Sequence, residues 1–374
     1  MWIWIKMFHL MKLLISGGGT GGHVFPAIAI ADAFKELHPE ADILFVGAQG
    51  KMEMKEVPKA GYKIIGLDIG GFQRKFTVQN VTLVYRLIKS LLQANRILKS
   101  FKPDVVVGVG GYASGPILRM SAWNHIPFVI QEQNSYAGVT NKIMASKASR
   151  ICVAFEHMDR FFEKSKLVNT GNPVRREFIV PVNRLDAFQY YGLDPNKKTI
   201  CVFGRSLGAR TLNEVIAEQY EMLMHRDDLQ ILWQVGRQFI EEFALTPIAQ
   251  LKNVKMLAFI DRMDLAYAIA DVAIARAGAL TISELAATHT VAVLVPSPNV
   301  AEDHQRKNAE SMISQGAARM VLDKDAKQGL WKEVISLLDD HLSQEKIKNA
   351  LKHSAKPEAA KEIAKCIDQL VKKN

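Results

Sequence analysis

A glycine-rich segment that ends in a histidine is the first part of the chain whose residue types point to chemistry. Residues 16–26 read SGGGTGGHVFP and follow the apolar run KLLI. Glycine permits positive φ and close backbone approach, so the segment predicts a tight turn from a strand into a helix. Its spacing is neither GxGxxG nor GxxxxGK[ST], which excludes the two common phosphate-loop motifs. At the helix N-terminus His23 would stay neutral and able to accept a proton, or it would only satisfy a backbone carbonyl.

Four other glycine-rich or polar segments also follow apolar runs. They are residues 108–116 (GVGGYASGP), 131–141 (QEQNSYAGVTN), 204–210 (GRSLGAR) and 275–284 (ARAGALTISE). In a parallel sheet such segments gather at the carboxyl ends of the strands. Several of them together favour a phosphate-bearing ligand that is held by backbone N–H groups and helix N-termini.

The segment 275–284 carries the most information about a ligand. Ala279 to Ser283 would supply N–H groups at the start of a helix, with Glu284 placed to bind a sugar diol. The alternative is that this carboxylate only favours the helix N-terminus electrostatically. Arg175 is a candidate diphosphate contact, or else a plain surface arginine. Residues 296–308 combine a proline-rich loop with Asp303, His304, Gln305 and Asn308, of which Asp303, His304 and Asn308 could instead be capping residues.

Apolar runs alternate with helical patterns along the whole chain, which predicts parallel sheets buried on both faces. The fold class is therefore α/β, with two Rossmann-like doubly wound domains that face a central cleft. We expect an N-terminal extension at 1–11, a first domain at 12–170, a second at 171–355 and a C-terminal helix at 356–374 that returns to the first domain. Residues 168–178 are predicted to form the linker. Strands are predicted at 12–16, 42–47, 63–69, 104–110, 127–132, 150–155, 199–204, 229–236, 254–260, 271–278 and 292–298.

Composition narrows the classes of partner. The 374 residues are 48% hydrophobic and 23% charged, with a net charge of +10 that favours anionic partners such as phosphorylated substrates or an acidic membrane surface. No nucleic-acid-binding motif occurs, so we expect no nucleic-acid partner. The three cysteines are far apart and suit a reducing cytoplasm without a zinc site. The apolar start, MWIWIKMFHLM, is too short to span a bilayer. It is either an interfacial anchor or an upstream extension, and we favour the extension because Met11 resembles a natural start.

Five motifs taken together resemble one enzyme family over nearly the whole chain. They are GGTGGHVFPAIAIA, KPDVVVGVGGYASGP, EQNSYAGVTNK, TGNPVR and RAGALTISE. They are similar to the MurG family, the N-acetylglucosamine transferases that act on lipid I in peptidoglycan synthesis. The resemblance implies a GT-B fold, no metal or cofactor, and inverting transfer of GlcNAc from UDP-GlcNAc to the MurNAc 4-hydroxyl of lipid I, which gives lipid II. It also implies a peripheral location on the cytoplasmic face of the inner membrane.

The resemblance carries roles onto matching positions of this sequence. It implies that the backbone of Ile260 meets the uracil and that Glu284 meets the ribose. His23 is our candidate general base. Other UDP-GlcNAc contacts are implied for Thr20, Gly21, Gly22, Asn134, Arg175, Ser206, Ala279, Leu280, Thr281, Ile282, Ser283 and Gln305, and the acceptor loop for Gly110, Gly111, Tyr112 and Ser114.

A basic, amphipathic stretch at residues 81–93 is a candidate membrane-facing surface. Val81, Tyr85, Ile88 and Leu91 fall roughly on one helical face, with Arg86 close by. Basic residues beside exposed apolar ones suit binding to anionic lipid, whereas a buried core face is the alternative.

Of two departures from the family pattern, the one at residue 205 keeps other functions open, whereas the one at residue 289 concerns helix termination more than chemistry. Arg205 stands where the family usually has glycine, and His289 stands where it often has another glycine, at a helix end. The alternatives are another GT-B UDP-sugar transferase or epimerase, or a nucleotide-sugar-binding protein with impaired catalysis.

Overall fold

The computed structural model describes residues 10–69, 79–204 and 208–372, but only the backbone of residues 79–85 and 301. Residues 1–9 of the predicted extension at 1–11 lie outside these ranges, and so do Arg205 and the predicted UDP-GlcNAc contact Ser206. The chain divides into two compact units, one of Met1–Arg175 with Glu358–Asn374 and one of Arg176–Pro357. The expected domain boundary at residue 170 lies five residues before the division at Arg175.

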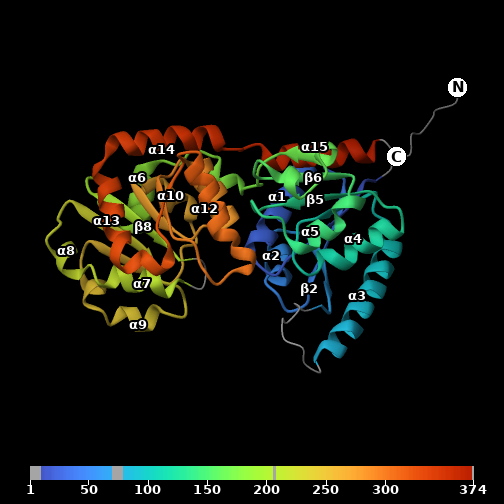
Figure 1. The fold of residues 1–374 in the computed structure, drawn as a ribbon, viewed down its shortest axis with the longest axis horizontal. Coiled ribbons are helices and arrows are strands. Elements are labelled where there is room, and N and C mark those ends of the chain that lie inside the picture. Colours follow the sequence, from blue (N-terminus) through green and yellow to red (C-terminus); the bar gives the residue numbers. More distant parts are fainter. Residues whose placement is uncertain (1–9, 70–78, 205–207, 373–374) are drawn as a thin grey trace. The chain divides into compact units, whose positions relative to one another are not determined.

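The first unit is a parallel sheet with strand order β3-β2-β1-β4-β5-β6-β7 (Figure 1). Its strands are β1 Lys12–Ser16, β2 Asp42–Ala48, β3 Lys63–Leu67, β4 Val105–Gly108, β5 Phe128–Glu132, β6 Arg150–Val153 and β7 Leu167–Asn169. Its helices are α1 Gly21–Leu37, α2 Glu53–Lys59, α3 Gln79–Phe101, α4 Ser114–Trp123, α5 Val139–Met144 and α15 Ala359–Val371.

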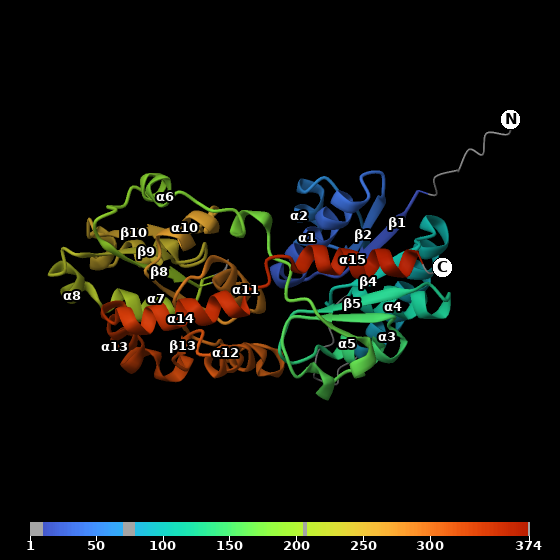
Figure 2. The same ribbon diagram turned by 90° about the horizontal axis from the view of Figure 1, so that it is seen from above.

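Successive side chains of each strand are buried on opposite faces of this sheet. Leu13 and Ile15 of β1 pack with Phe34 of α1 and Ile367 of α15, whereas Leu14 packs on the other face with residues of α3 and α4. The last helix of the chain thus lies against α1 in the first unit (Figure 2). Successive side chains of a strand point to opposite faces of the sheet, and helices cover both faces. Every side chain of these strands is therefore buried, which explains why the strands are apolar without interruption.

The second unit repeats the arrangement with strand order β10-β9-β8-β11-β12-β13. Its strands are β8 Lys198–Phe203, β9 Leu229–Gln234, β10 Val254–Leu257, β11 Val272–Ala275, β12 Ala292–Leu294 and β13 Arg319–Met320. Its helices are α6 Arg184–Tyr191, α7 Arg210–Ala217, α8 Tyr220–Met224, α9 Ile240–Ala244, α10 Met263–Ile269, α11 Ala279–Thr288, α12 His304–Ser314, α13 Ala326–Asp339 and α14 His341–Ser354.

Two short edge strands were not predicted. The segment 168–178 was expected to be a linker, but it begins inside β7, which pairs in parallel with β6. β13 consists of two residues beside β12. Each is too short to show a periodic pattern, and its conformation follows from the neighbouring strand, so the linker expectation was wrong for residues 168 and 169.

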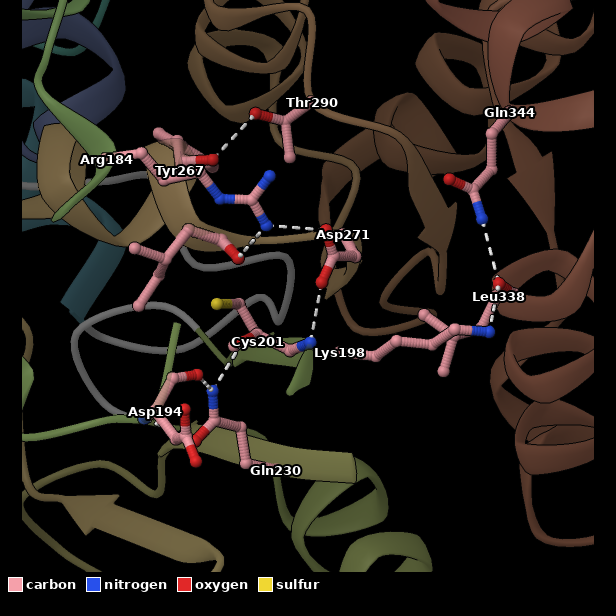
Figure 3. Close-up of polar contacts among 12 residues, drawn as sticks. Arg184, Asp194, Lys198, Cys201, Gln230, Tyr267, Asp271, Thr290, Leu338 and Gln344 are labelled. Atoms are coloured by element: carbon pink, nitrogen blue, oxygen red, sulfur yellow. Dashed lines mark hydrogen bonds and ion pairs between the residues drawn. The ribbon is translucent and has the colours of Figure 1, made fainter. Parts of the chain in front are cut away.

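Polar contacts connect the amino ends of strands in the second sheet (Figure 3). Asp271, just before β11, accepts from the backbone N–H of Thr199 at 2.7 Å and from Arg184 at 2.6 Å. A cavity of about 340 Å³ lies here, lined among others by Arg184, Lys198 and Gln344. This cavity lies at the amino ends of the strands, whereas the glycine-rich loops follow the carboxyl ends. We therefore infer that these contacts stabilise the fold and do not bind the substrate.

The glycine at position 111 carries a testable packing constraint. Gly111 has φ +82°, and a Cβ built there would stand 2.3 Å from the carbonyl oxygen of Gly18. Because that neighbour is backbone and cannot swing away, Gly111→Ala is expected to lower the free energy of unfolding by about 3 kcal/mol. Gly50 is the matched control: its φ is +73° but nothing lies within 4 Å of a Cβ, so Gly50→Ala should cost only about 1 kcal/mol. Urea unfolding measures both, and equal losses would contradict the packing argument.

The end of α11 provides a second prediction. His289 caps this helix in the left-handed conformation, with φ 54° and ψ 32°, which explains why glycine suits the position. His289→Gly is therefore expected to raise the free energy of unfolding by about 1 kcal/mol.

The same substitution has a pH signature. Burial, with the charge of Lys352, lowers the pKa of His289. A lowered folded-state pKa means that protonation favours unfolding, so this histidine costs stability as the pH falls below its unfolded value of about 6.5. The advantage of His289→Gly should hence be larger at acidic than at neutral pH. A pH-independent difference in urea midpoint would contradict the role of the imidazole.

Candidate functional site

The glycine-rich turn of the first unit joins β1 to α1. Ser16 ends the strand, and α1 begins at Gly21 after Thr20. A Cβ on Gly17 would stand 2.2 Å from Cγ2 of Val109, and the N–H of Gly18 donates to the carbonyl of Gly110 at 3.3 Å. Part of the glycine content therefore serves the contact between two neighbouring loops of the protein, not the approach of a ligand.

His23 lies in the first turn of α1 and is half-buried. Its Nδ1 is 3.1 Å from the carbonyl oxygen of Gly18 and 3.3 Å from Oγ1 of Thr20. A carbonyl can only accept, so the contact to Gly18 assigns the proton to Nδ1 and leaves Nε2 as the basic nitrogen. A Cβ on Gly110 would stand 3.0 Å from Nε2, so the ring packs close to this glycine, where a side chain would crowd it.

A buried carboxylate that the sequence reasoning missed supports the same turn. Glu53, the first residue of α2, is 1% exposed. Its Oε2 accepts from the N–H of Gly19 at 2.9 Å, and its Oε1 accepts from the N–H of Ala48 at 2.9 Å. A single acidic residue in an ordinary helical pattern gives no signal of this role.

The second loop connects β4 to α4 and holds the predicted acceptor residues. Gly110 and Gly111 both have positive φ, and Tyr112 extends outward with 54% of its surface exposed. The hydroxyl of Ser114 is buried and donates to the carbonyl of Gly111 at 2.9 Å. Ser114 thus shapes the loop, whereas Tyr112 is the accessible side chain of the set.

The third loop follows β5 and is organised by Glu132, which is 1% exposed. Its carboxylate accepts from the N–H groups of Asn134 and Gly138 and from the side chain of Asn141, at 2.8 to 3.0 Å. Burial raises the pKa of Glu132, and these hydrogen bonds oppose the shift. The predicted donor contact Asn134 is therefore held in place by its neighbour two residues earlier.

A buried amide network lies beneath the second and third loops. Gln131 donates to Asn172 at 2.9 Å, and Asn172 donates to the carbonyl of Gln133 at 3.0 Å. Gln133 donates in turn to the carbonyl of Val109 at 2.7 Å. All three amides are buried, so the network fixes the second and third loops to each other.

The predicted diphosphate contact Arg175 also belongs to the first unit. Its guanidinium group lies over the ring of Phe25, 5.1 Å from the ring centroid.

In the second unit the predicted phosphate site is the N-terminus of α11. Gly278 precedes the helix in an extended conformation and accepts from the N–H of Ile282 at 3.0 Å. The N–H groups of Ala279, Leu280 and Thr281 therefore point out of the helix end, where the dipole favours an anion. Ser283 donates its hydroxyl to the carbonyl of Ala279 at 3.0 Å, which makes it a poorer candidate than its neighbours for a phosphate contact through the side chain.

Glu284 is oriented by a tyrosine of the preceding helix. Oη of Tyr267, on α10, donates to Oε2 of Glu284 at 3.0 Å. The ring of Tyr267 is buried edge-on against Phe203 and Phe178. The carboxylate therefore has a fixed direction, as a group that recognises a diol requires.

The other predicted donor residues are placed at the same edge of the second sheet. The N–H of Ile260 donates to Oε1 of Gln234 at 3.1 Å. A nucleotide base recognised by the backbone of Ile260 would therefore bind the carbonyl of Ile260, or would displace the side-chain amide of Gln234 from the N–H. Gln305 is fully buried and accepts from the N–H of Ser297 at 2.9 Å. Among the described residues its Nε2 has no hydrogen-bond partner. A buried donor left unsatisfied is costly, which favours a ligand or water oxygen there.

The described part of the predicted membrane-facing stripe differs from expectation in one residue. On α3, Ile88 is 53% exposed, but Leu91 is half-buried, and Leu92 is exposed in its place at 57%. Leu91 falls on the face that buries Ala94 and Leu98, one and two turns further on. The side chains of Val81 and Tyr85 lie outside the described residues. Within the residues that the structure describes, no helix combines the length and apolar character needed to cross a bilayer.

More exposed apolar residues lie on the helices that follow α3 in the first unit. They are Trp123 on α4, 73% exposed, with Val139 and Ile143 on α5, 56% and 68% exposed. α4 packs against both α3 and α5. The sequence reasoning missed these residues because helices α4 and α5 are short and carry no amphipathic repeat.

Comparison with known proteins gives matches to both units. The chain matches the glycosyltransferase family 28 N-terminal domain over residues 13–153 and the C-terminal domain of that family over residues 199–365. The crystal structure of Acinetobacter baumannii MurG aligns with a TM-score of 0.76 at 28% identity, covering 96% of this chain and 99% of that one. A putative UDP-N-acetylglucosamine 2-epimerase from Listeria monocytogenes aligns with a TM-score of 0.72 at 14% identity, which shows a shared fold alone.

Two relatives extend the match to nearly the full sequence. Both are named UDP-N-acetylglucosamine–N-acetylmuramyl-(pentapeptide) pyrophosphoryl-undecaprenol N-acetylglucosamine transferase. The one from Parabacteroides distasonis is 49% identical, over 96% of this chain and 99% of its own length. The one from Flavobacterium psychrophilum is 47% identical, over 96% of this chain and 97% of its own length. The chain, with its two parallel sheets and glycine-rich loops, belongs to glycosyltransferase family 28 and within it to the MurG family.

Proposed function

We propose that this protein transfers GlcNAc from UDP-GlcNAc to the MurNAc 4-hydroxyl of lipid I, which gives lipid II. The observation that carries the proposal is the near-full-length identity of 47% and 49% to relatives named for this transfer. The geometry adds a basic imidazole nitrogen in the first unit and, in the second, a helix N-terminus suited to a diphosphate.

The proposed reaction is a single displacement with inversion at the sugar. Nε2 of His23 accepts the proton of the MurNAc 4-hydroxyl while that oxygen bonds to C1 of GlcNAc. The bond between C1 and the diphosphate oxygen breaks, and UDP departs with the electron pair. N–H groups at the start of α11 would offset the negative charge that develops on UDP.

The donor would be recognised mainly by the second unit. We assign the ribose diol to Glu284, held by Tyr267 at 3.0 Å, and the sugar to Gln305 with its unsatisfied Nε2. The backbone at Ile260 is assigned to the base. The loop positions Thr20, Gly21, Gly22 and Asn134 of the first unit, with Arg175 and Ser206, remain proposed contacts.

Purified protein, radiolabelled UDP-GlcNAc and a lipid I analogue test the function and the base together. Wild-type protein should form labelled lipid II, and His23→Ala should lower kcat by about 10²–10⁴-fold, as loss of a general base does. His353→Ala is the control, because that imidazole is exposed and, among the described residues, its hydrogen bond is to the carbonyl of Asn349 on its own helix. Epimerised UDP-sugar without lipid product would overturn the function, whereas a loss below about tenfold in His23→Ala would overturn the base.

We further propose that the protein binds the cytoplasmic surface of the inner membrane peripherally, as a lipid-borne acceptor requires. Exposed Ile88 and Leu92 lie one turn apart on α3, beside the exposed cations Arg86 and Lys89. Lys89 also pairs with Asp68 at 3.2 Å, an exposed contact that lipid headgroups can replace. Apolar side chains next to cations suit an interface with anionic lipid.

Vesicle pelleting tests this surface. The double variant Ile88→Glu/Leu92→Glu is expected to lower binding to phosphatidylglycerol vesicles more than tenfold, because two apolar anchors are lost and two repelled charges are added. The control is Leu245→Glu/Leu342→Glu, which changes two leucines of the second unit that are 88% and 77% exposed. Equal losses in the two double variants would contradict a surface centred on α3.

A further inference from the structure

One peptide group lies between Glu53 and His23. The carbonyl of the peptide that joins Gly18 to Gly19 accepts from Nδ1 of His23 at 3.1 Å. The N–H of the same peptide donates to Oε2 of Glu53 at 2.9 Å. A carboxylate, a planar amide and an imidazole are therefore connected in series by two hydrogen bonds.

The carboxylate of Glu53 is enclosed by backbone donors. Both carboxyl oxygens accept from backbone N–H groups, of Gly19 and Ala48, each at 2.9 Å. The side chain is 1% exposed, so its charge is little screened by water.

Glycines at positions 18 and 47 leave space for the side chain of Glu53. A Cβ on Gly18 would stand 2.2 Å from Oε1 of Glu53, and one on Gly47 would stand 2.5 Å from its Cγ. Two glycines are thus needed to admit this carboxylate beneath the turn.

We propose that Glu53 is a positioning residue that acts on His23 through the Gly18–Gly19 peptide. This inference rests on the proposed role of His23 as base. The negative charge polarises the peptide, because hydrogen bonds in a chain strengthen one another at low dielectric. The carbonyl of Gly18 becomes a stronger acceptor, holds the proton on Nδ1 and so keeps Nε2 as the proton-accepting nitrogen. The role is that of the carboxylate that orients a catalytic or metal-bound histidine, with a peptide group interposed.

Glu53→Gln tests the proposal, because it keeps the shape of the side chain and removes the charge. ¹⁵N NMR of histidine-labelled protein at alkaline pH reports which ring nitrogen carries the proton, with the His23 signals assigned by their loss in His23→Ala. The variant should move the two His23 signals toward each other, as the two tautomers become mixed. It should also lower kcat by about ten- to hundredfold, the usual range for such outer partners, while KM for UDP-GlcNAc changes less than about twofold.

Glu56→Gln is the matched control. Glu56 lies on the same helix α2, one turn further on, and pairs only with Lys59, at 2.8 Å, among the contacts of its side chain that the structure describes. Its substitution should leave both the His23 signals and kcat unchanged.

Each outcome decides the matter. Unchanged His23 signals in a folded Glu53→Gln variant would overturn the proposal, and so would a fall in kcat matched by an equal rise in KM. The NMR result does not need turnover, so it stands even if the wild-type protein forms no lipid II and the proposed function fails. If circular dichroism shows Glu53→Gln unfolded, Glu53→Asp replaces it. Its shorter side chain draws the carboxylate away from the N–H of Gly19 and should cause the same spectral change to a smaller degree, and no change would overturn the inference.

Discussion

Backbone-to-backbone contact between two loops is the constraint on which the first unit depends. The turn after β1 and the loop after β4 come so close that a Cβ on Gly111 would meet the carbonyl oxygen of Gly18 at 2.3 Å. Side chains at these positions would separate the loops. The positions of His23, above the turn, and of Tyr112, at the rim of the second loop, follow from this contact. Buried carboxylates then fix the loops from beneath, Glu53 under the first and Glu132 under the third.

The second unit positions its candidate ligand contacts by a different device. The N-terminus of α11 presents its N–H groups without further support, because the helix itself orients them. Glu284 is fixed from a neighbouring helix by Tyr267, whose ring is packed between aromatic side chains. Glycine brings two loops together in this unit as well, since a Cβ on Gly208, after β8, would stand 2.0 Å from the carbonyl oxygen of Val235, after β9. Glu284 and the start of α11, by contrast, are placed by a side chain and by the helix itself.

Much of the fold could be read from the sequence because its strands are buried on both faces. Runs such as residues 105–108 and 272–275 are apolar throughout, and the structure places central strands β4 and β11 there. β7 and β13 could not be predicted, since two or three residues carry no period and owe their conformation to the adjacent strand. On α3 a helical pattern identified an apolar face, but the packing of Ala94 and Leu98 decided that Leu92, not Leu91, is exposed.

The sequence by itself determined the two-sheet α/β architecture, the loops that follow the strands and the family, because these depend on local pattern and on motifs of adjacent residues. The tertiary structure alone decided that Glu53 lies under the glycine turn and that Tyr267 orients Glu284. These pairs are 34 and 17 residues apart in the chain. Parallel register brings the carboxyl ends of neighbouring strands to one edge of a sheet, and distant polar groups meet there. Because no local sequence pattern indicates such long-range contacts, the role of a buried carboxylate in an ordinary helix can be identified only from the tertiary structure.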